Sequence, residues 1–175
     1  QYLREGGPAN ARAFFMHIAA RFFGAEVQAP PPRPLPAVAI FHPAHDLGSV
    51  DAWRADWLPG APCVLLLFYR AHLQAGNTAV FAALCEALLA AGLNPLPLAL
   101  LSLKDSVCAD TLQRLCDAHD AALILNTTAF SRAALDEPGD HALAGDRPVL
   151  QLVLSGANEE SWRADAHGLA ARDIA

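Results

Sequence analysis

Residues 64–77 read Val64-Leu-Leu-Leu-Phe-Tyr-Arg-Ala-His-Leu-Gln-Ala-Gly-Asn77, and this stretch decides the fold. The continuous apolar run at its start is typical of a parallel β-strand that is covered on both faces. Four polar side chains follow within eight residues: Arg70, His72, Gln74 and Asn77. An Ala- and Leu-rich helix is predicted next, over 78–91. Ligands of open α/β sheets bind outside the carboxyl ends of the strands, so these polar groups predict a site for an anionic, polar ligand.

The same alternation of strand and helix recurs along the chain. Further strands are predicted at 37–41, 96–101, 121–125 and 148–154, and a helix at 106–119. Strands that alternate with helices pair in parallel through right-handed crossovers. We therefore predict an α/β fold with a mainly parallel sheet flanked by helices, either Rossmann-like or flavodoxin-like. Parallel pairing would also bring His42, which follows the first strand, to the same sheet edge as His72.

The remaining segments suggest how the chain is organised. Residues 1–29 are predicted as a helical segment with an apolar stripe, and the stripe consists of Phe14, Phe15, Ile18, Phe22 and Phe23. A Pro-rich linker at 30–36 cannot be helical and is expected to be extended. The sheet domain is predicted over 37–158, and 159–175 is expected to begin a following region. Trp53 and Trp57 lie four residues apart in a short predicted helix and are expected to face the core.

Several segments match one known protein family in order and across nearly the whole chain. The most specific are Tyr2-Leu-Arg-Glu-Gly-Gly-Pro-Ala-Asn10, Leu67-Phe-Tyr-Arg-Ala-His-Leu-Gln-Ala-Gly-Asn-Thr78 and Ser102-Leu-Lys-Asp105. The chain resembles the large subunits of metal chelatases, the family that contains CobN-type cobaltochelatase subunits and the porphyrin-binding H subunit of magnesium chelatase. The Ser-Leu-Lys-Asp element favours the cobalt branch. The resemblance also implies that the chain is an excerpt of a larger multidomain polypeptide.

This resemblance implies a function. The large subunit would insert Co²⁺, its substrate metal, into a corrin ring of the hydrogenobyrinic acid a,c-diamide type during cobalamin biosynthesis. ATP would be used by separate AAA+ ATPase subunits and not bound here, which agrees with the lack of a Gly-x-x-x-x-Gly-Lys-Ser/Thr motif. Two alternatives stay open: a magnesium or other metal chelatase large subunit, and a non-catalytic tetrapyrrole-binding scaffold.

The candidate site residues follow from the chemistry of metal insertion. His72 and His42 are candidate catalytic groups, because imidazole accepts protons near neutral pH. His42, His45 and Asp46 are candidate metal ligands. The candidates for binding a corrinoid's carboxylates and amides are Arg70, Asn77, Lys104, Asn126 and Gln151. A structural role is the alternative for each: His42 precedes Pro43, and the amides could tie together loops at the sheet edge.

Composition excludes some other classes. The chain has 12 Lys and Arg residues against 18 Asp and Glu residues, a net charge of −6, and no basic stripe of the kind that nucleic-acid binding requires. The apolar runs are strand-sized, so no membrane span is predicted. The four cysteines lack zinc-ligand spacing and are predicted to be buried free thiols, which suits a cytoplasmic protein.

Overall fold

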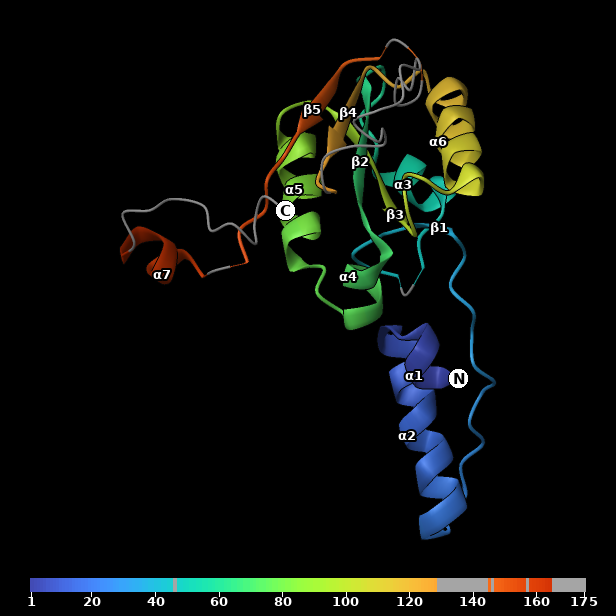
Figure 1. Cartoon of the computed structure of the whole chain (residues 1–175). Coiled ribbons are helices and arrows are strands. Elements are labelled where there is room, and N and C mark those ends of the chain that lie inside the picture. Colours follow the sequence, from blue (N-terminus) through green and yellow to red (C-terminus); the bar gives the residue numbers. More distant parts are fainter. Residues whose placement is uncertain (46, 129–144, 146, 157, 165–175) are drawn as a thin grey trace.

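A five-stranded sheet lies at the centre of the structure, a computed structural model that describes residues 1–45, 47–128, 145, 147–156 and 158–164 (Figure 1). The strand order is β1-β3-β2-β4-β5. The strands are β1 (Val38–Ile40), β2 (Cys63–Tyr69), β3 (Asn94–Leu100), β4 (Leu123–Asn126) and β5 (Val149–Gln151). Each coincides with a predicted strand, so the α/β prediction is confirmed.

Four of the strands are parallel and one is not. β2 pairs in parallel with β3 and with β4, and β4 pairs in parallel with β5. This order of the parallel strands is that of flavodoxin-like sheets. β1 is antiparallel to β3, with Val38 opposite Leu100 and Ile40 opposite Leu98. The expectation that parallel pairing places His42 at the carboxyl edge is therefore wrong, because β1 begins at that edge and runs away from it.

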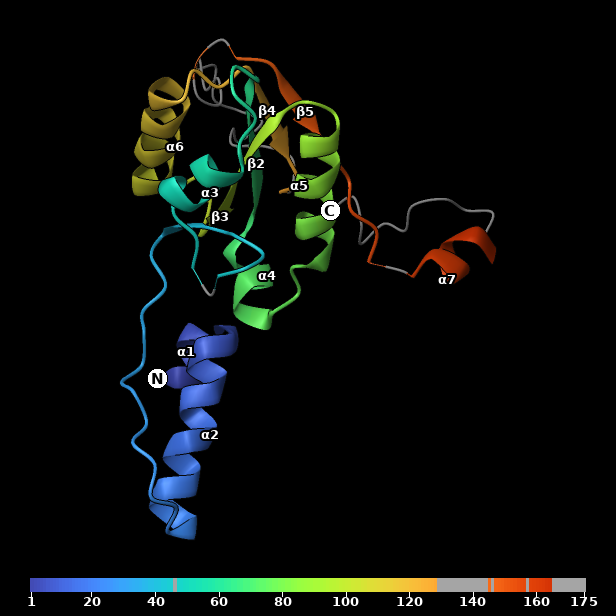
Figure 2. The ribbon, with the colours of Figure 1, turned by 180° about the vertical axis from the view of Figure 1, so that it is seen from behind.

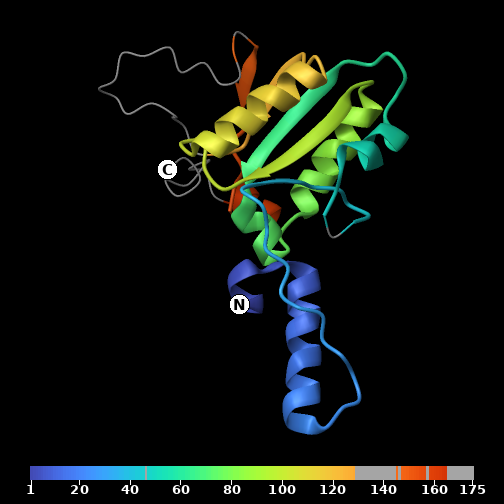
Figure 3. The same cartoon turned by 90° about the vertical axis from the view of Figure 1, so that its right-hand side faces the viewer.

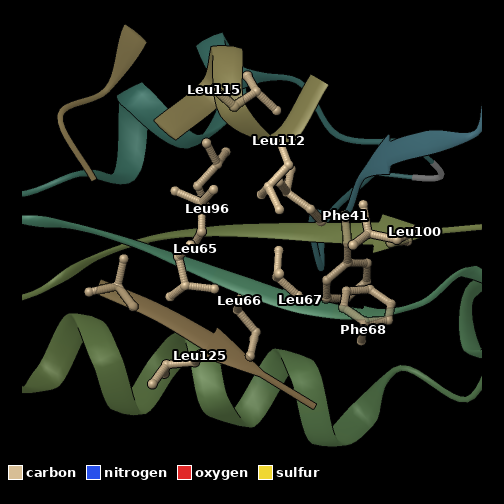
Figure 4. Packing of buried hydrophobic residues seen from close by; sticks show 14 of the residues in the cluster. Phe41, Leu65, Leu66, Leu67, Phe68, Leu96, Leu100, Leu112, Leu115 and Leu125 are labelled. Atoms are coloured by element: carbon tan, nitrogen blue, oxygen red, sulfur yellow. The ribbon is translucent and has the colours of Figure 1, made fainter. Parts of the chain in front are cut away.

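Helices cover both faces of the sheet. α5 (Ala79–Ala90) lies on one face, while α6 (Ser106–Ala118) and the short α3 (Val50–Asp56) lie on the other (Figures 2 and 4). β2 is buried from Cys63 to Phe68, as a central strand between two helical layers must be. Leu112 and Leu115 of α6 pack on one side of it, and Leu66 and Leu125 face α5 (Figure 4).

Local sequence explains where the helices begin and end. Ser49 and Asp105 are N-caps whose side chains accept hydrogen bonds from Ala52 N–H and Cys108 N–H. Trp53 and Trp57 donate their indole N–H groups to the carbonyls of Phe41 and Pro95, so both rings are fixed against the core as predicted. α4 (Arg70–Ala75) was not predicted; it follows β2 directly and ends at Gly76 in the left-handed conformation.

The N-terminal residues form two helices and not the single one predicted. α1 (Tyr2–Glu5) and α2 (Gly7–Phe23) meet at Gly6, and we call them together the helical arm. α2 ends at Gly24, which is left-handed as a terminating glycine should be. The arm extends away from the sheet, and the segment from Gly24 to Pro36 runs back alongside it to β1 (Figures 1 and 3). Among the described residues, the helix α7 (Glu159–Ala164) follows β5.

Candidate functional site

The carboxyl edge of the sheet contains a topological switch point between β2 and β4. From β2 the chain crosses through α5 to β3 on one side, and it then crosses back through α6 to β4 on the other. Ligands of open α/β sheets bind at such points. Arg70 and His72 follow β2 here, Lys104 follows β3, and Asn126 ends β4, so these four predicted residues do share one edge.

Arg70 is engaged with the main chain of the Pro-rich segment. Its Nη1 donates hydrogen bonds to the carbonyl oxygens of Leu35, at 2.9 Å, and Pro36, at 2.8 Å. Its Nε is buried and has no hydrogen-bond partner in the described part of the chain. Glu5 accepts hydrogen bonds from the Arg4 guanidinium and from Leu35 N–H, and these two bonds lower the pKa of its carboxyl group. The nearby charge of Arg70 lowers this pKa a little further. Arg70 thus anchors the segment that leads from the helical arm to β1.

His72 keeps an uncommitted imidazole. Its ring is half-buried and contacts the Phe81 ring edge to face, with centroids 5.1 Å apart. Burial lowers the pKa of His72 below its ordinary value, which favours the neutral imidazole near pH 7. Among the described residues we find no hydrogen bond to either ring nitrogen. A neutral imidazole with this freedom can accept a proton or bind a metal ion.

Asn126 and Gln151 bond to each other. Asn126 Nδ2 donates to Gln151 Oε1 at 2.8 Å, and Asn126 Oδ1 accepts from both the N–H and the hydroxyl of Thr128. Gln151 Nε2 donates to the Thr128 carbonyl at 2.7 Å. The three residues form a closed network that joins the ends of β4 and β5. Both amides thus have the loop-tying geometry that was the structural alternative for them.

The loop after β1 borders a hollow of about 200 Å³, which we call the histidine hollow. It lies where the loop after β1 meets the turn between α4 and α5. Its lining consists of Pro8, Phe41, His42, Pro43, Ala44, His45, Leu73, Gly76 and Thr78. The His42 and His45 rings lie side by side, with centroids 4.7 Å apart. His42 and His45 therefore reach the segment that follows β2 through the loop after β1 and not through parallel pairing.

The two histidines of this hollow differ in their freedom. His42 is buried against Trp53, its Nδ1 accepts a hydrogen bond from Ala44 N–H, and its Nε2 lies 3.0 Å from Asp56 Oδ2. Because Nδ1 accepts, the proton resides on Nε2 and is donated to Asp56. Both nitrogens of His42 are thus used within the chain. His45 is exposed, and its ring nitrogens make no hydrogen bond in the described residues.

The other predicted ligand groups lie at the surface. Asn77 and Lys104 are exposed, and their side chains make no hydrogen bond within the described residues. Asp46, predicted as a metal ligand, lies outside those residues. Within them, no group of three His, Cys, Asp or Glu side chains is arranged to hold a metal ion. No helix in the same part of the chain has the length and apolar character needed to cross a membrane.

Sequence reasoning assigned no structural role to two residues that organise this region. Asn10, in the quoted segment 2–10, bonds to both the N–H and the carbonyl of Arg33. Gln74 donates to the carbonyls of Arg4 and Glu5 and so joins α4 to the helical arm. Their place in family-specific segments was the available signal. Their partners are backbone groups far away in sequence, which a motif does not reveal.

Comparison with known proteins places this arrangement in a class. Over residues 1–175 the chain matches the family described as CobN/Magnesium Chelatase. It is 46% identical over its whole length to the aerobic cobaltochelatase subunit CobN of Pseudomonas aeruginosa, and 34% identical over 99% of its length to the subunit of the same name from a Sinorhizobium species. The chain spans 14% of the length of each relative.

A solved structure shares the fold. The catalytic subunit of cobaltochelatase from Mycobacterium tuberculosis matches 98% of this chain with a TM-score of 0.69, at 24% identity and over 14% of its own chain. The α/β sheet with its helical arm therefore shares its fold with one part of that subunit. The chain belongs to the CobN/magnesium chelatase family.

Proposed function

We propose that the chain is part of the large subunit of an ATP-dependent cobaltochelatase. This subunit inserts Co²⁺ into a corrin ring of the hydrogenobyrinic acid a,c-diamide type, in the cytoplasm, during cobalamin biosynthesis. AAA+ ATPase subunits bind and hydrolyse the ATP. The observation that carries the proposal is the 46% identity, over all 175 residues, to an aerobic cobaltochelatase subunit.

The free side chains near the sheet edge receive the chemical roles. Metal insertion requires a group that replaces water around the ion and a base that removes the protons of the ring nitrogens. We assign transient metal binding to His45, which is exposed in the histidine hollow, and proton acceptance to His72, whose neutral form is favoured. To Asn77 and Lys104, which are exposed, we assign contact with the amides and carboxylates of a corrinoid.

The committed side chains receive supporting roles. His42 orients the loop that carries His45, because Asp56 and Ala44 use both of its ring nitrogens. Arg70 fixes the Pro-rich segment, and Asn126 with Gln151 fixes the ends of β4 and β5. For these four residues we therefore propose a supporting role and not direct contact with the ligand.

The test is cobalt insertion by the full-length large subunit with its AAA+ partners, ATP, Co²⁺ and hydrogenobyrinic acid a,c-diamide. His72→Ala should lower the turnover number and leave corrinoid affinity near the wild-type value, since a proton acceptor acts in the chemical step. His45→Ala should raise the Co²⁺ concentration needed for half-maximal rate. His17→Ala, which removes an exposed histidine from α2, is the matched control and should change neither quantity.

The outcomes separate the alternatives. Insertion of Mg²⁺ into a porphyrin in place of Co²⁺ would identify a magnesium chelatase. Corrinoid binding without insertion under any metal would identify a non-catalytic scaffold. Wild-type kinetics in both the His45 and His72 variants would remove the two assignments and leave the family relationship intact.

A further inference from the structure

The outer face of α2 carries an apolar stripe whose two phenylalanines are largely exposed in the described structure. The stripe consists of Ala11, Phe15, Ile18 and Phe22, which follow one another at intervals of four, three and four residues. This spacing aligns them on one side of the helix. The stripe differs from the predicted one, which included Phe14 and Phe23. The exposed fractions of Phe15 and Phe22 are 69% and 68%, so two large aromatic rings face solvent. The helix that carries them extends away from the sheet (Figure 3).

The inner face of the same helix is already used. Asn10 and Ala13 are buried, and Asn10 bonds to Arg33 in the returning segment. The hydroxyl of Tyr2 donates to the carbonyl of Pro30 at 2.6 Å. The segment from Gly24 to Pro36 therefore packs on this face, and the apolar stripe points away from it.

The stripe continues into a second concavity. A hollow of about 260 Å³ lies at the base of the arm and is lined by Tyr2, Leu3, Gly6, Gly7, Pro8, Ala11, Gln74, Ala75 and Gly76. Ala11 belongs to both the stripe and this hollow, and Leu3 beside it is 71% exposed. Together they form a continuous apolar track along α2 that ends against α4. A track of this shape, with residues spaced as in helix packing, fits another α-helix.

The charges beside the track indicate the character of that helix. α2 contains Arg12 and Arg21 but no Asp or Glu. An interface gains specificity when charges of opposite sign meet at its rim. A helix with an apolar seam and acidic residues flanking the seam would complement α2, whereas a second copy of α2 would bring arginine against arginine.

We propose that this track is the docking surface for an acidic, amphipathic helix from another part of the same large-subunit polypeptide. The chain spans 14% of the length of its relatives, so about six-sevenths of a full-length subunit lies outside it. Interfaces between permanently joined parts are the apolar ones, and a stripe with two exposed phenylalanines fits that kind of contact better than a transient one. This inference requires membership of the family and does not depend on the metal or the ring.

A photocrosslinking experiment identifies the occupant directly. The full-length subunit carries p-benzoylphenylalanine at position 15 or, separately, at position 23, and is irradiated alone and with its AAA+ partners. The position-15 probe should give one dominant crosslink within the same polypeptide, to a peptide with apolar residues at helical spacing and flanking Asp or Glu. Crosslinks to a second copy, to an AAA+ subunit, or to no protein at all would each overturn the proposal.

Two adjacent phenylalanines provide a matched pair of variants. Phe22 lies on the stripe, and Phe23 lies about 100° around the helix although it is 80% exposed. In the full-length subunit, Phe22→Ser should speed amide hydrogen exchange of α2 and of the crosslinked helix by roughly tenfold or more, because an aromatic ring leaves a buried contact. Phe23→Ser should leave both unchanged. Equal effects of the two variants, or no effect of either, would contradict the assigned surface.

Discussion

Asn94 and Leu58 hold each other through two hydrogen bonds. Leu58 N–H donates to Asn94 Oδ1 at 2.7 Å, and Asn94 Nδ2 donates to the Leu58 carbonyl at 2.9 Å and also to the Ala61 carbonyl at 3.0 Å. Asn94 begins β3 and is only 5% exposed. One buried amide therefore fixes the turn that leads into the central strand β2.

Asn94→Ala should destabilise the chain by about 2 kcal/mol, because three backbone groups lose their hydrogen-bond partner next to a buried side chain. Urea unfolding followed by circular dichroism measures the change. The control is Asn77→Ala, which removes an exposed amide and should stay within about 0.5 kcal/mol of wild type. An Asn94 variant as stable as the Asn77 variant would show that water replaces the amide without cost.

Gly6→Ala should detach the helical arm from α4. A Cβ at Gly6 would lie 2.8 Å from both Cβ and the carbonyl oxygen of Gln74, and the φ of 68° with ψ of −167° is a conformation almost restricted to glycine. Amide hydrogen exchange in α1 and α2 should rise strongly. Gly24→Ala is the control, since Gly24 also has positive φ but no atom lies within 4 Å of its Cβ position. Equal exchange in the two variants would rule out the close approach as the cause.

The four cysteines should be unreactive in the folded protein. All four are buried free thiols, and burial raises the pKa of Cys63 and Cys85 to about 12 and that of Cys116 to about 11. Thiolate is the reactive form, so DTNB at pH 8 should label none of them in native protein and all four in guanidinium chloride. Val107→Cys adds a thiol at an exposed position and should be labelled at once. Rapid labelling of the native wild type would contradict the packing of these residues.

His72 should make the free energy of unfolding decrease as the pH falls below about 6.5. Burial lowers its pKa in the folded state below the ordinary value of 6.5, so the unfolded chain binds a proton more readily. The contribution of the neutral ring is complete above pH 6.5 and is lost as pH falls from there towards the lower folded pKa. His72→Leu removes this dependence and keeps an apolar contact with Phe81. Unfolding free energies at pH 7.5 and 5.5 should therefore differ less in the variant, and an equal difference would exclude His72 as the titrating group.

Much of the sheet could be predicted because its strands are apolar runs bounded by polar residues and prolines. The direction of β1 could not, because a three-residue strand such as Val38–Ile40 pairs equally well either way and its orientation depends on the path of the Pro-rich segment. α4 was missed although Gly76 signals its end, since a six-residue helix has too little periodicity to recognise.

The sheet edge on which the candidate residues lie was predictable, but the hydrogen bonds of their side chains were not. The strand ends correctly indicated which edge collects Arg70, His72, Lys104 and Asn126. Which of these side chains are free to bind a ligand was not predictable. Arg70, for example, bonds to the backbone carbonyls of Leu35 and Pro36, and because every residue has a backbone carbonyl, no sequence motif reveals such a partner. The histidine hollow depends on the antiparallel course of β1 and was equally hidden.

The antiparallel direction of β1 also determines where the helical arm is attached to the sheet. Because β1 starts at the carboxyl edge, the segment that feeds it, and the arm behind that segment, must be rooted at the same edge as Arg70 and α4. A helix of 17 residues is about 25 Å long, so a tilt of about 10° at Gly6 moves its far end by about 4 Å. Conversely, a displacement of about 4 Å at the far end of α2 corresponds to a rotation of only about 10° at Gly6, beside the switch point.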